Sequence, residues 1–255
     1  GNTFILKPSE QTPLAGLKLA EYLKEAGLPD GVFNVVNGAK TIVEALCDHS
    51  DIKAVAFVGS SNIAKTVYNR CSQNSKRSLC LGGAKNHMIV VPDADTDSTA
   101  KGLLASSMGS AGQRCMAASV AVGVANIDHI IDRLIEEARS FKLGVDMGTI
   151  ISKNALDRIT GYIDEAEKMG AKILVDGRDI SPPDGYERGY WLGATILDGV
   201  DPDWPSAKEE IFGPVLSIIR AGTIEEAMKI ENDNPYGNAA AVFTTSGQIA
   251  KVVSE

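Results

Sequence analysis

Apolar runs of strand type alternate with helix-type patterns along most of this sequence. In the first third, residues 3–6, 31–36 and 52–58 are the apolar runs, and leucines, isoleucines and alanines recur at helical spacing between them. Alternation at this spacing predicts βαβ units and a parallel sheet of the doubly wound type. The alternation continues through the second half, so we predict an α/β fold built from two lobes.

We place the boundary between the lobes in the glycine-rich stretch 79–87, which we interpret as a crossing between domains. The first domain then covers residues 1–83 and the second covers residues 84–255. In the first lobe we expect helices at 14–27, 41–47 and 62–71; in the second, strands at 88–91, 118–124, 172–175, 190–197 and 239–244, and helices at 97–108, 127–135 and 153–169.

Net charge and hydropathy argue against two classes of binding partner, nucleic acids and membranes. The net charge is −8, and the lysines and arginines are scattered, so we expect neither a nucleic-acid surface nor an anionic-membrane surface. No apolar run approaches the roughly 20 residues that a bilayer requires. With 44% hydrophobic residues the chain can bury a large core, and we predict a soluble protein of the cytoplasm, with the mitochondrial matrix as the alternative.

Four cysteines, Cys47, Cys71, Cys80 and Cys115, lack CxxC spacing and a nearby histidine cluster. This pattern argues against a disulfide scaffold and against a zinc site, and we expect no metal. The sequence has no initiator methionine, and residues 247–255 begin a helical pattern that stops without a cap. We therefore expect a piece of a longer polypeptide.

Cys115 ends a run of small residues, Gly109-Ser-Ala-Gly-Gln-Arg-Cys, and has Arg114 beside it. Small residues allow a substrate to come close to the backbone, and a neighbouring cation favours the reactive thiolate form of a cysteine. Cys115 is therefore a candidate nucleophile. The alternative is an inert cysteine packed in a core, which is the commoner role of a lone cysteine.

The first lobe offers a candidate nucleotide site where the strand 52–58 runs into Gly59 and Ser60. Ligands of open α/β sheets bind beyond the carboxyl ends of the strands, where the start of a helix offers free N–H groups to phosphate. Lys7 and Glu10 also follow a strand and could hydrogen-bond ribose hydroxyls. The alternatives are an ordinary strand-to-helix turn and two solvated surface charges.

A second chemical stretch is Lys208-Glu-Glu210-Ile-Phe212-Gly-Pro-Val215, which places a carboxylate and an aromatic ring at the start of a strand. Glu210 could hold a ribose hydroxyl while Phe212 packs against the same nucleotide. Loop positions of this kind often carry function. The alternative is a capped strand with a core phenylalanine.

Five motifs in one order together resemble the aldehyde dehydrogenase superfamily. They span nearly the whole chain: Lys7-Pro-Ser-Glu10, Phe57-Val-Gly59-Ser60, Gly112-Gln-Arg-Cys115, Glu210-Ile-Phe-Gly-Pro-Val215 and Asn234-Pro-Tyr-Gly. The resemblance implies an NAD-binding domain at 1–83, a catalytic domain at 84–255 and Cys115 as the nucleophile. It also implies these NAD contacts: Lys7, Glu10, Gln11, Gly59, Ser60, Gly82, Glu210 and Phe212.

One departure from the family's pattern points to a branch. Most members carry a water-activating glutamate in a Glu-Leu-Gly-Gly-Lys pattern, and Leu81 occupies that position here. A leucine takes no proton, so we expect poor hydrolysis of the acyl-enzyme. Gly83-Ala-Lys-Asn-His87 is similar to the methylmalonate-semialdehyde dehydrogenases, which pass the acyl group to coenzyme A.

The resemblance therefore implies an aldehyde substrate, with NAD as cofactor and coenzyme A as co-substrate. Arg114 could pair with a carboxylate of that substrate. It also implies that the full-length protein is a homo-oligomer, a dimer or a tetramer. Two alternatives stay open: an NAD-dependent aldehyde dehydrogenase that hydrolyses its thioester, and a nucleotide-binding chain without turnover.

Overall fold

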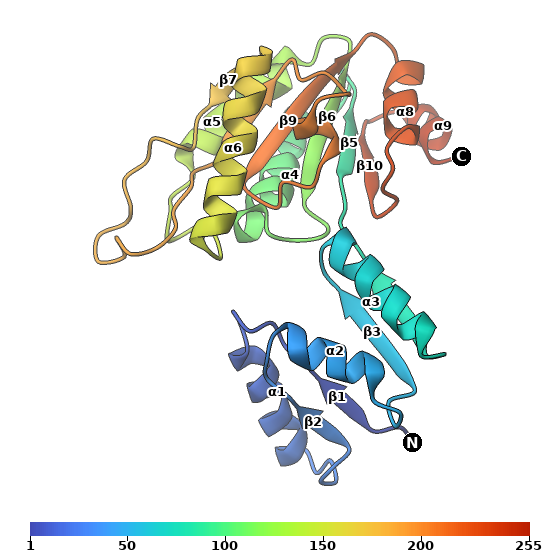
Figure 1. Cartoon of the computed structure of the whole chain (residues 1–255). Helices are drawn as coiled ribbons and strands as arrows, with labels where there is room; N and C mark the ends of the chain where they lie inside the picture. The colour runs from blue at the N-terminus through green and yellow to red at the C-terminus, as the bar shows by residue number, and fades with distance from the viewer. The chain divides into compact units, whose positions relative to one another are not determined.

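The computed structural model describes residues 1–255 and divides them into two compact units, Gly1–Gly83 and Ala84–Glu255. Strands and helices alternate in both units, which confirms the predicted α/β class (Figure 1). None of the helices combines the length and the apolar composition that crossing a membrane requires.

The first unit contains two parallel strand pairs rather than one continuous sheet. Its elements in chain order are β1 (Phe4–Leu6), α1 (Leu14–Glu25), β2 (Phe33–Val35), α2 (Lys40–Asp48), β3 (Ala54–Val58), α3 (Ser61–Gln73) and β4 (Arg77–Leu81). β1 pairs with β2 and β3 pairs with β4, so each pair is a βαβ unit with one crossover helix. The predicted βαβ order is confirmed. The predicted continuous parallel sheet is replaced in this unit by two separate parallel strand pairs.

The division between the two units falls at Gly83 and Ala84, inside the stretch 79–87 that we interpret as a crossing between domains. The first residues of that stretch are strand instead, because β4 (Arg77–Leu81) pairs along its whole length with β3. The alternation of its residues explains why this strand is not predicted. Ser78 and Cys80 turn inward while Leu79 and Leu81 are exposed, so the short strand lacks a continuous apolar run, and Gly82 and Gly83 follow at once.

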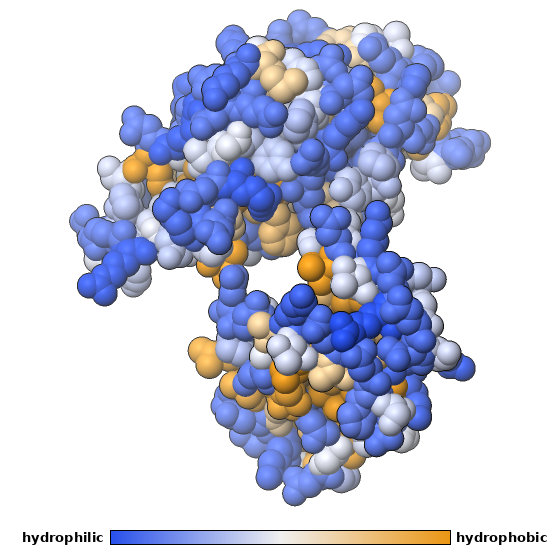
Figure 2. Space-filling model, viewed as in Figure 1, coloured by the Kyte–Doolittle hydropathy of each residue, from blue (hydrophilic) through white to orange (hydrophobic).

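The small core of the first unit lies on one face of the β3–β4 pair. Cys47, Val67 and Cys71 are buried there, and Phe57 and Cys80 pack against them. The opposite face is exposed through residues such as Val58, Leu79 and Leu81. Figure 2 shows apolar residues gathered on the visible face of this unit.

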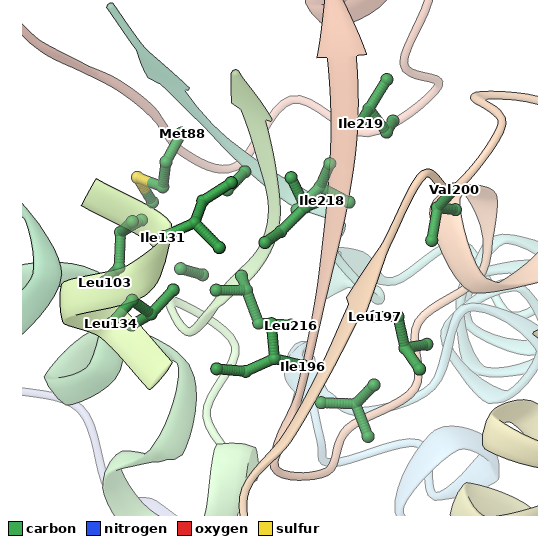
Figure 3. Close-up of a cluster of buried hydrophobic side chains, with 14 of the residues drawn as sticks. Met88, Leu103, Ile131, Leu134, Ile196, Leu197, Val200, Leu216, Ile218 and Ile219 are labelled. Carbon is green, nitrogen blue, oxygen red and sulfur yellow. The ribbon is translucent and has the colours of Figure 1, made fainter. Parts of the chain in front are cut away.

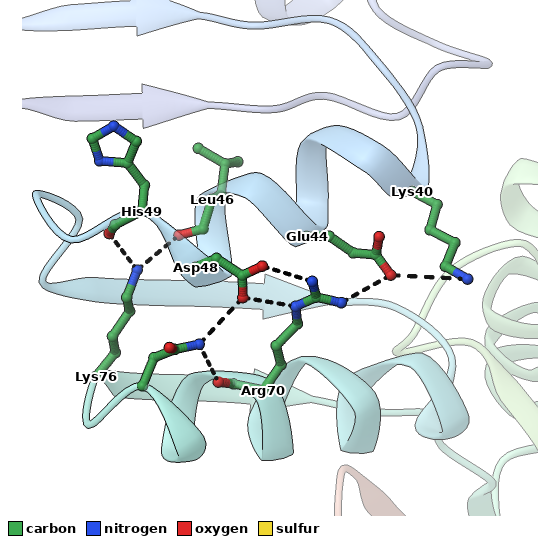
Figure 4. A network of polar contacts seen from close by, with 8 residues as sticks. Lys40, Glu44, Leu46, Asp48, His49, Arg70 and Lys76 are labelled. Atoms are coloured by element: carbon green, nitrogen blue, oxygen red, sulfur yellow. Dashed lines mark hydrogen bonds and ion pairs between the residues drawn. The ribbon is translucent and has the colours of Figure 1, made fainter.

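Ionic and hydrogen-bond contacts connect α2 to α3 and to the turn that follows α3 (Figure 4). Arg70 of α3 donates to both oxygens of the Asp48 carboxylate, at 2.8 and 2.6 Å, and its third nitrogen lies 2.9 Å from Glu44. Lys76 donates to the carbonyls of Leu46 and His49 at the end of α2. A bidentate Arg–carboxylate pair fixes geometry better than a single contact, so this network sets the register of the two helices.

The second unit is a six-stranded sheet in the order β10-β5-β6-β9-β8-β7. All neighbours are parallel except β7 and β8, so the sheet is mixed rather than fully parallel. Its strands are β5 (Asn86–Val90), β6 (Ala118–Val124), β7 (Lys172–Val175), β8 (Thr195–Asp198), β9 (Val215–Ala221) and β10 (Ala240–Phe243). Its helices are α4 (Thr96–Met108), α5 (Asp128–Ser140), α6 (Lys153–Met169), α7 (Pro205–Lys208), α8 (Ile224–Asn232) and α9 (Gly247–Ser254).

The large hydrophobic core belongs to this sheet. β5 is buried along its length, β6 and β9 almost so, as central parallel strands usually are. Figure 3 shows part of the core: Leu103 of α4 and Ile131 and Leu134 of α5 lie beside Ile196 of β8 and Leu216 of β9. In Figure 1, α6 lies in front of the sheet and α4 behind it. This core is the rigid base on which the loops at the strand ends are carried.

Two sequence expectations for this unit need correction. The strand expected at 190–197 begins only at Thr195, and Tyr190 forms an isolated bridge with Ile150 instead. Helices α7 and α8 were not expected at all. α8 carries a signal that would have found it, because Thr223 caps it by accepting from the Glu226 N–H, and a threonine three residues before a glutamate is a typical helix start.

Candidate active site

Cys115 lies in a loop that connects α4 to β6, which we call the nucleophile loop and define as residues 109–116. The Cys115 thiol is exposed, whereas Cys47 and Cys71 are buried and Cys80 is half-buried. An inert core cysteine would be covered, so the exposure favours the reactive interpretation of this residue.

Three successive residues near the start of the nucleophile loop lie in the left-handed backbone region. Ser110, Ala111 and Gly112 have φ of 54°, 53° and 65°. A non-glycine residue rarely takes this conformation, and two in succession cost free energy that the surrounding structure has to offset. Gly112 has a second constraint, because a Cβ there would lie 2.0 Å from the carbonyl oxygen of Gly213.

Side chains of the loop itself hold it against neighbouring backbone. Arg114 donates to the carbonyls of Ala105 and Ser106 at the end of α4, at 2.7 and 3.0 Å. Its positive charge also interacts favourably with the negative end of the α4 helix dipole. Gln113 donates to the Thr149 carbonyl at 3.1 Å and accepts from the Ile151 N–H at 2.9 Å. The two residues that precede the cysteine are thus anchored to neighbouring backbone.

The stretch between α7 and β9 packs directly against this loop. Glu210 accepts a hydrogen bond from the Ala84 N–H at 3.0 Å, and Arg158 donates to the Glu210 carbonyl. Phe212 also has a left-handed backbone, with φ of 54°, and the residue is 39% exposed. The Ile-Phe-Gly-Pro sequence therefore makes a tight turn that presents Glu210 and Phe212.

These two stretches form one hollow at the ends of β5, β6 and β9. Its lining includes Arg114, Cys115, Glu210 and Phe212. Four candidate residues from motifs about 100 positions apart in the sequence are therefore brought together. A thiol, a guanidinium, a carboxylate and an aromatic ring around one hollow can attack, orient and stack against a small polar substrate.

The remaining candidates lie in the first unit, in two groups. Gly59 and Ser60 follow β3 and Gly82 follows β4, at the same edge of the pair because Val58 is registered with Leu81. Ser60 occupies the N-cap of α3 without a side-chain cap bond. A Cβ on Gly82 would lie 3.0 Å from the Ser61 hydroxyl, so glycine keeps this corner open to close approach.

The second group follows β1. Lys7 donates to the Gly38 carbonyl at 2.8 Å and lies 3.4 Å from Glu10. Hydrogen bonds from the Glu10 N–H and then from Lys7 hold the pKa of the Glu10 carboxyl below its ordinary value. Gln11 is exposed, and its N–H donates to the Ser9 hydroxyl. A lysine and an ionised carboxylate therefore stand together at the end of a parallel strand.

Lys85 is a feature of the site region to which the sequence assigned no role. Its side chain is 1% exposed and its Nζ has no hydrogen-bond partner. Burial lowers the pKa of this amine from 10.5 to about 7, against the opposing effect of the Glu210 and Glu209 carboxylates. A lysine in a glycine-rich connection looks solvated in the sequence, and only the fold reveals that it is covered.

The fold and the site thus define an α/β protein that presents a single exposed cysteine beside a carboxylate and an aromatic ring. The sequence model of the aldehyde dehydrogenase family matches residues 1–255, and the chain belongs to that family. The resemblance inferred from the five motifs is thereby confirmed.

Its relatives include proteins of one branch of the family. A mitochondrial acylating methylmalonate-semialdehyde dehydrogenase of Arabidopsis thaliana is 50% identical over 98% of this chain and 42% of its own length. A malonate-semialdehyde dehydrogenase of Pseudomonas aeruginosa is 44% identical over 99% of this chain and 52% of its own. The chain thus spans about half the length of these curated relatives.

Two solved structures of proteins with related names are also similar to this chain. A Sinorhizobium meliloti protein assigned as a methylmalonate-semialdehyde dehydrogenase, and complexed with NAD, superimposes with a TM-score of 0.96 at 47% identity, covering all of this chain and 53% of its own. A methylmalonate-semialdehyde dehydrogenase of Oceanimonas doudoroffii has a TM-score of 0.96 at 45% identity, covering all of this chain and 54% of its own.

We predict that Gly112→Ala destabilises the second unit by about 1–3 kcal/mol, because the new Cβ meets backbone and the residue keeps a left-handed φ. Urea unfolding followed by tryptophan fluorescence measures this, since both tryptophans, Trp191 and Trp204, lie in the second unit. Gly148→Ala is the control, because a Cβ at Gly148 meets open space. Equal midpoints for the two variants would contradict the prediction.

We also predict a pH-dependent cost of burying Lys85. Between pH 7 and 10.5 the unfolded chain binds the lysine proton and the folded chain does not, so the free energy of unfolding rises with pH by up to about 1.4 kcal/mol per unit. Lys85→Met removes this titration. Its stability advantage over the wild type should therefore be largest below pH 7 and shrink toward pH 10; an advantage that stays constant with pH would refute the assignment.

Proposed function

We propose that this chain provides the nucleophile and the NAD contacts of an aldehyde dehydrogenase that oxidises malonate or methylmalonate semialdehyde and transfers the acyl group to coenzyme A. The observation that carries the proposal is the hollow around Cys115 in a chain 44–50% identical to (methyl)malonate-semialdehyde dehydrogenases over nearly its whole length. Residues 1–83 then serve as the NAD-binding domain and residues 84–255 as the catalytic domain.

The residues of the first unit fit a dinucleotide. The first N–H groups of α3 have no side-chain cap, and the start of a helix is a favourable place for a pyrophosphate beside Gly59, Ser60 and Gly82. Lys7 and Glu10, with Gln11 next to them, would take the adenosine ribose. Glu210 and Phe212 would orient the nicotinamide riboside. When bound, NAD supplies the acceptor for the hydride.

In the proposed reaction the Cys115 sulfur attacks the aldehyde carbon, and a tetrahedral thiohemiacetal forms. The backbone N–H of Cys115 stabilises its oxyanion, as preorganised donors do in acyl transfer. Loss of a hydride from this oxyanion leaves a thioester on Cys115, and the thiol proton has already passed to solvent when the thiolate formed. The thiol of coenzyme A then attacks the thioester carbon, releases the Cys115 thiol and carries away the acyl group, and a malonate-type substrate also loses carbon dioxide.

Leu81 supports acyl transfer to a thiol over hydrolysis. It ends β4, its side chain is 49% exposed, and it has no group that could take a proton from water. A thiol nucleophile needs little help from a base at neutral pH, so the acyl-enzyme would wait for coenzyme A. We further propose that the full-length protein forms a dimer or tetramer and works in the cytoplasm, with the mitochondrial matrix as the alternative, since its relatives are bacterial and mitochondrial.

The test mixes the protein with NAD and malonate semialdehyde and follows NADH by absorbance, with coenzyme A added after the first phase. We expect a burst of about one NADH per chain that becomes steady turnover only after coenzyme A is added, and no burst from Cys115→Ala. Steady turnover without coenzyme A would favour the hydrolytic alternative. NAD binding without any NADH would favour nucleotide binding without turnover.

The role of Arg114 in holding a substrate carboxylate has a separate test. Its Nη2 is engaged by α4, while Nε and Nη1 remain for a ligand. Losing a charged hydrogen bond costs about 1.5–3 kcal/mol, so Arg114→Leu should raise KM for malonate semialdehyde by about 10- to 100-fold relative to its effect on uncharged propanal. A parallel loss with both aldehydes would instead assign Arg114 to anchoring the helix end alone.

A further inference from the structure

Two asparagine side chains converge on one backbone atom, the carbonyl oxygen of Cys115. Asn86 donates to it at 2.8 Å, and Asn238 donates to it at 2.7 Å. Asn86 is the first residue of β5, and Asn238 lies in the turn before β10. Neither residue belongs to the nucleophile loop, so the contact joins three separate segments of the second unit.

The sheet brings these segments together. β5 pairs in parallel with β10 on one side and with β6 on the other, with His87 registered on Ala240 and Asn86 on Ala118. The amino-terminal ends of the three strands therefore lie at one edge. The nucleophile loop leads into β6 through Ala117, and its Cys115 carbonyl faces both asparagines. The geometry is thus set by strand register rather than by the loop.

Asn86 contributes to the structure through the N–H donors of its side-chain amide. The residue is 2% exposed, and its amide nitrogen also donates to the Ala117 carbonyl at 2.8 Å. Its Oδ1 is buried without a hydrogen-bond partner, which costs about 1–3 kcal/mol. An apolar residue of similar size would avoid that cost. The asparagine at this position is therefore explained by the two carbonyls to which it donates.

We propose that Asn86 and Asn238 form an amide clamp, a pair of positioning residues that fixes the peptide group after the nucleophile. The proposal rests on the proposed role of Cys115. Both lone pairs of the Cys115 carbonyl are taken by N–H donors, so this oxygen is held in one place and is not available to turn toward the reacting carbon. A free carbonyl oxygen there would repel the oxyanion that forms on the aldehyde.

The first test is amide hydrogen exchange of the chain, read by mass spectrometry on peptides that cover residues 109–118. Asn238 is exposed, so Asn238→Leu removes one donor, keeps the branching at Cγ and has little effect on the core. We expect exchange in this segment to speed up about tenfold, with exchange in α5 and α6 unchanged. Asn154→Leu, at an exposed asparagine of α6, is the matched control.

A rescue variant separates the donor from mere packing. Asn238→Gln keeps an amide donor on a longer side chain, and we expect it to retain most of the wild-type protection. If Asn238→Leu does not fold, by its tryptophan fluorescence, Asn86→Ser provides the same comparison from the other side. Unchanged exchange in the folded variants would overturn the clamp, whether or not the wild type oxidises an aldehyde.

The second measurement concerns catalysis. A misplacement of about 1 Å can cost about 100-fold in rate, so we expect the NADH burst of Asn238→Leu to slow by about 10- to 100-fold with KM for the aldehyde unchanged. A wild-type burst rate in a variant with faster exchange would overturn the positioning role. A wild type that makes no NADH would refute the proposed function, and the exchange data would still decide on the clamp.

Discussion

The close approach of two backbone segments, at Gly112 and Gly213, is the contact on which the site depends. Less than a side chain's width separates them, because a Cβ on Gly112 would lie 2.0 Å from the Gly213 carbonyl oxygen. This contact brings the nucleophile loop and the Glu210–Phe212 turn to one place, although the two stretches lead into different strands, β6 and β9. Glycine is needed at 112 for the left-handed φ as well as for the space.

Much of the surrounding polar structure keeps this contact in register. Arg114 holds the loop to the end of α4, Gln113 holds it to residues 149–151, and Glu210 is tied to the Ala84 N–H. Each bond is worth about 1 kcal/mol, comparable to the cost of one left-handed non-glycine residue. At the site, stabilising hydrogen bonds therefore offset the cost of the left-handed backbone, while the sheet beneath supplies the rigid frame.

Strongly periodic elements could be predicted from the sequence. The bounds of β6 and α6 follow from long apolar patterns, those of β7 follow from a short continuous apolar run, and the structure reproduces all three. β4 could not be predicted, because it alternates small polar and apolar residues and has no continuous apolar run. At the site, the sequence motifs predict Cys115, Glu210 and Phe212, and these residues lie around one hollow. Asn86, Asn238 and the covered amine of Lys85 stayed hidden, because their roles arise from burial and strand register.

The distribution of thiols has a consequence for the chemical selectivity of the chain. Three of the four cysteines lie in the first unit, where Cys47 and Cys71 are sealed in its core and Cys80 is half-covered, and burial raises the pKa of the Cys47 thiol to about 11. An electrophile in solution therefore meets one exposed cysteine, Cys115. The first unit protects its own cysteines by folding around them, so the thiol that an added alkylating reagent reaches is decided by which cysteines are covered as much as by what surrounds Cys115.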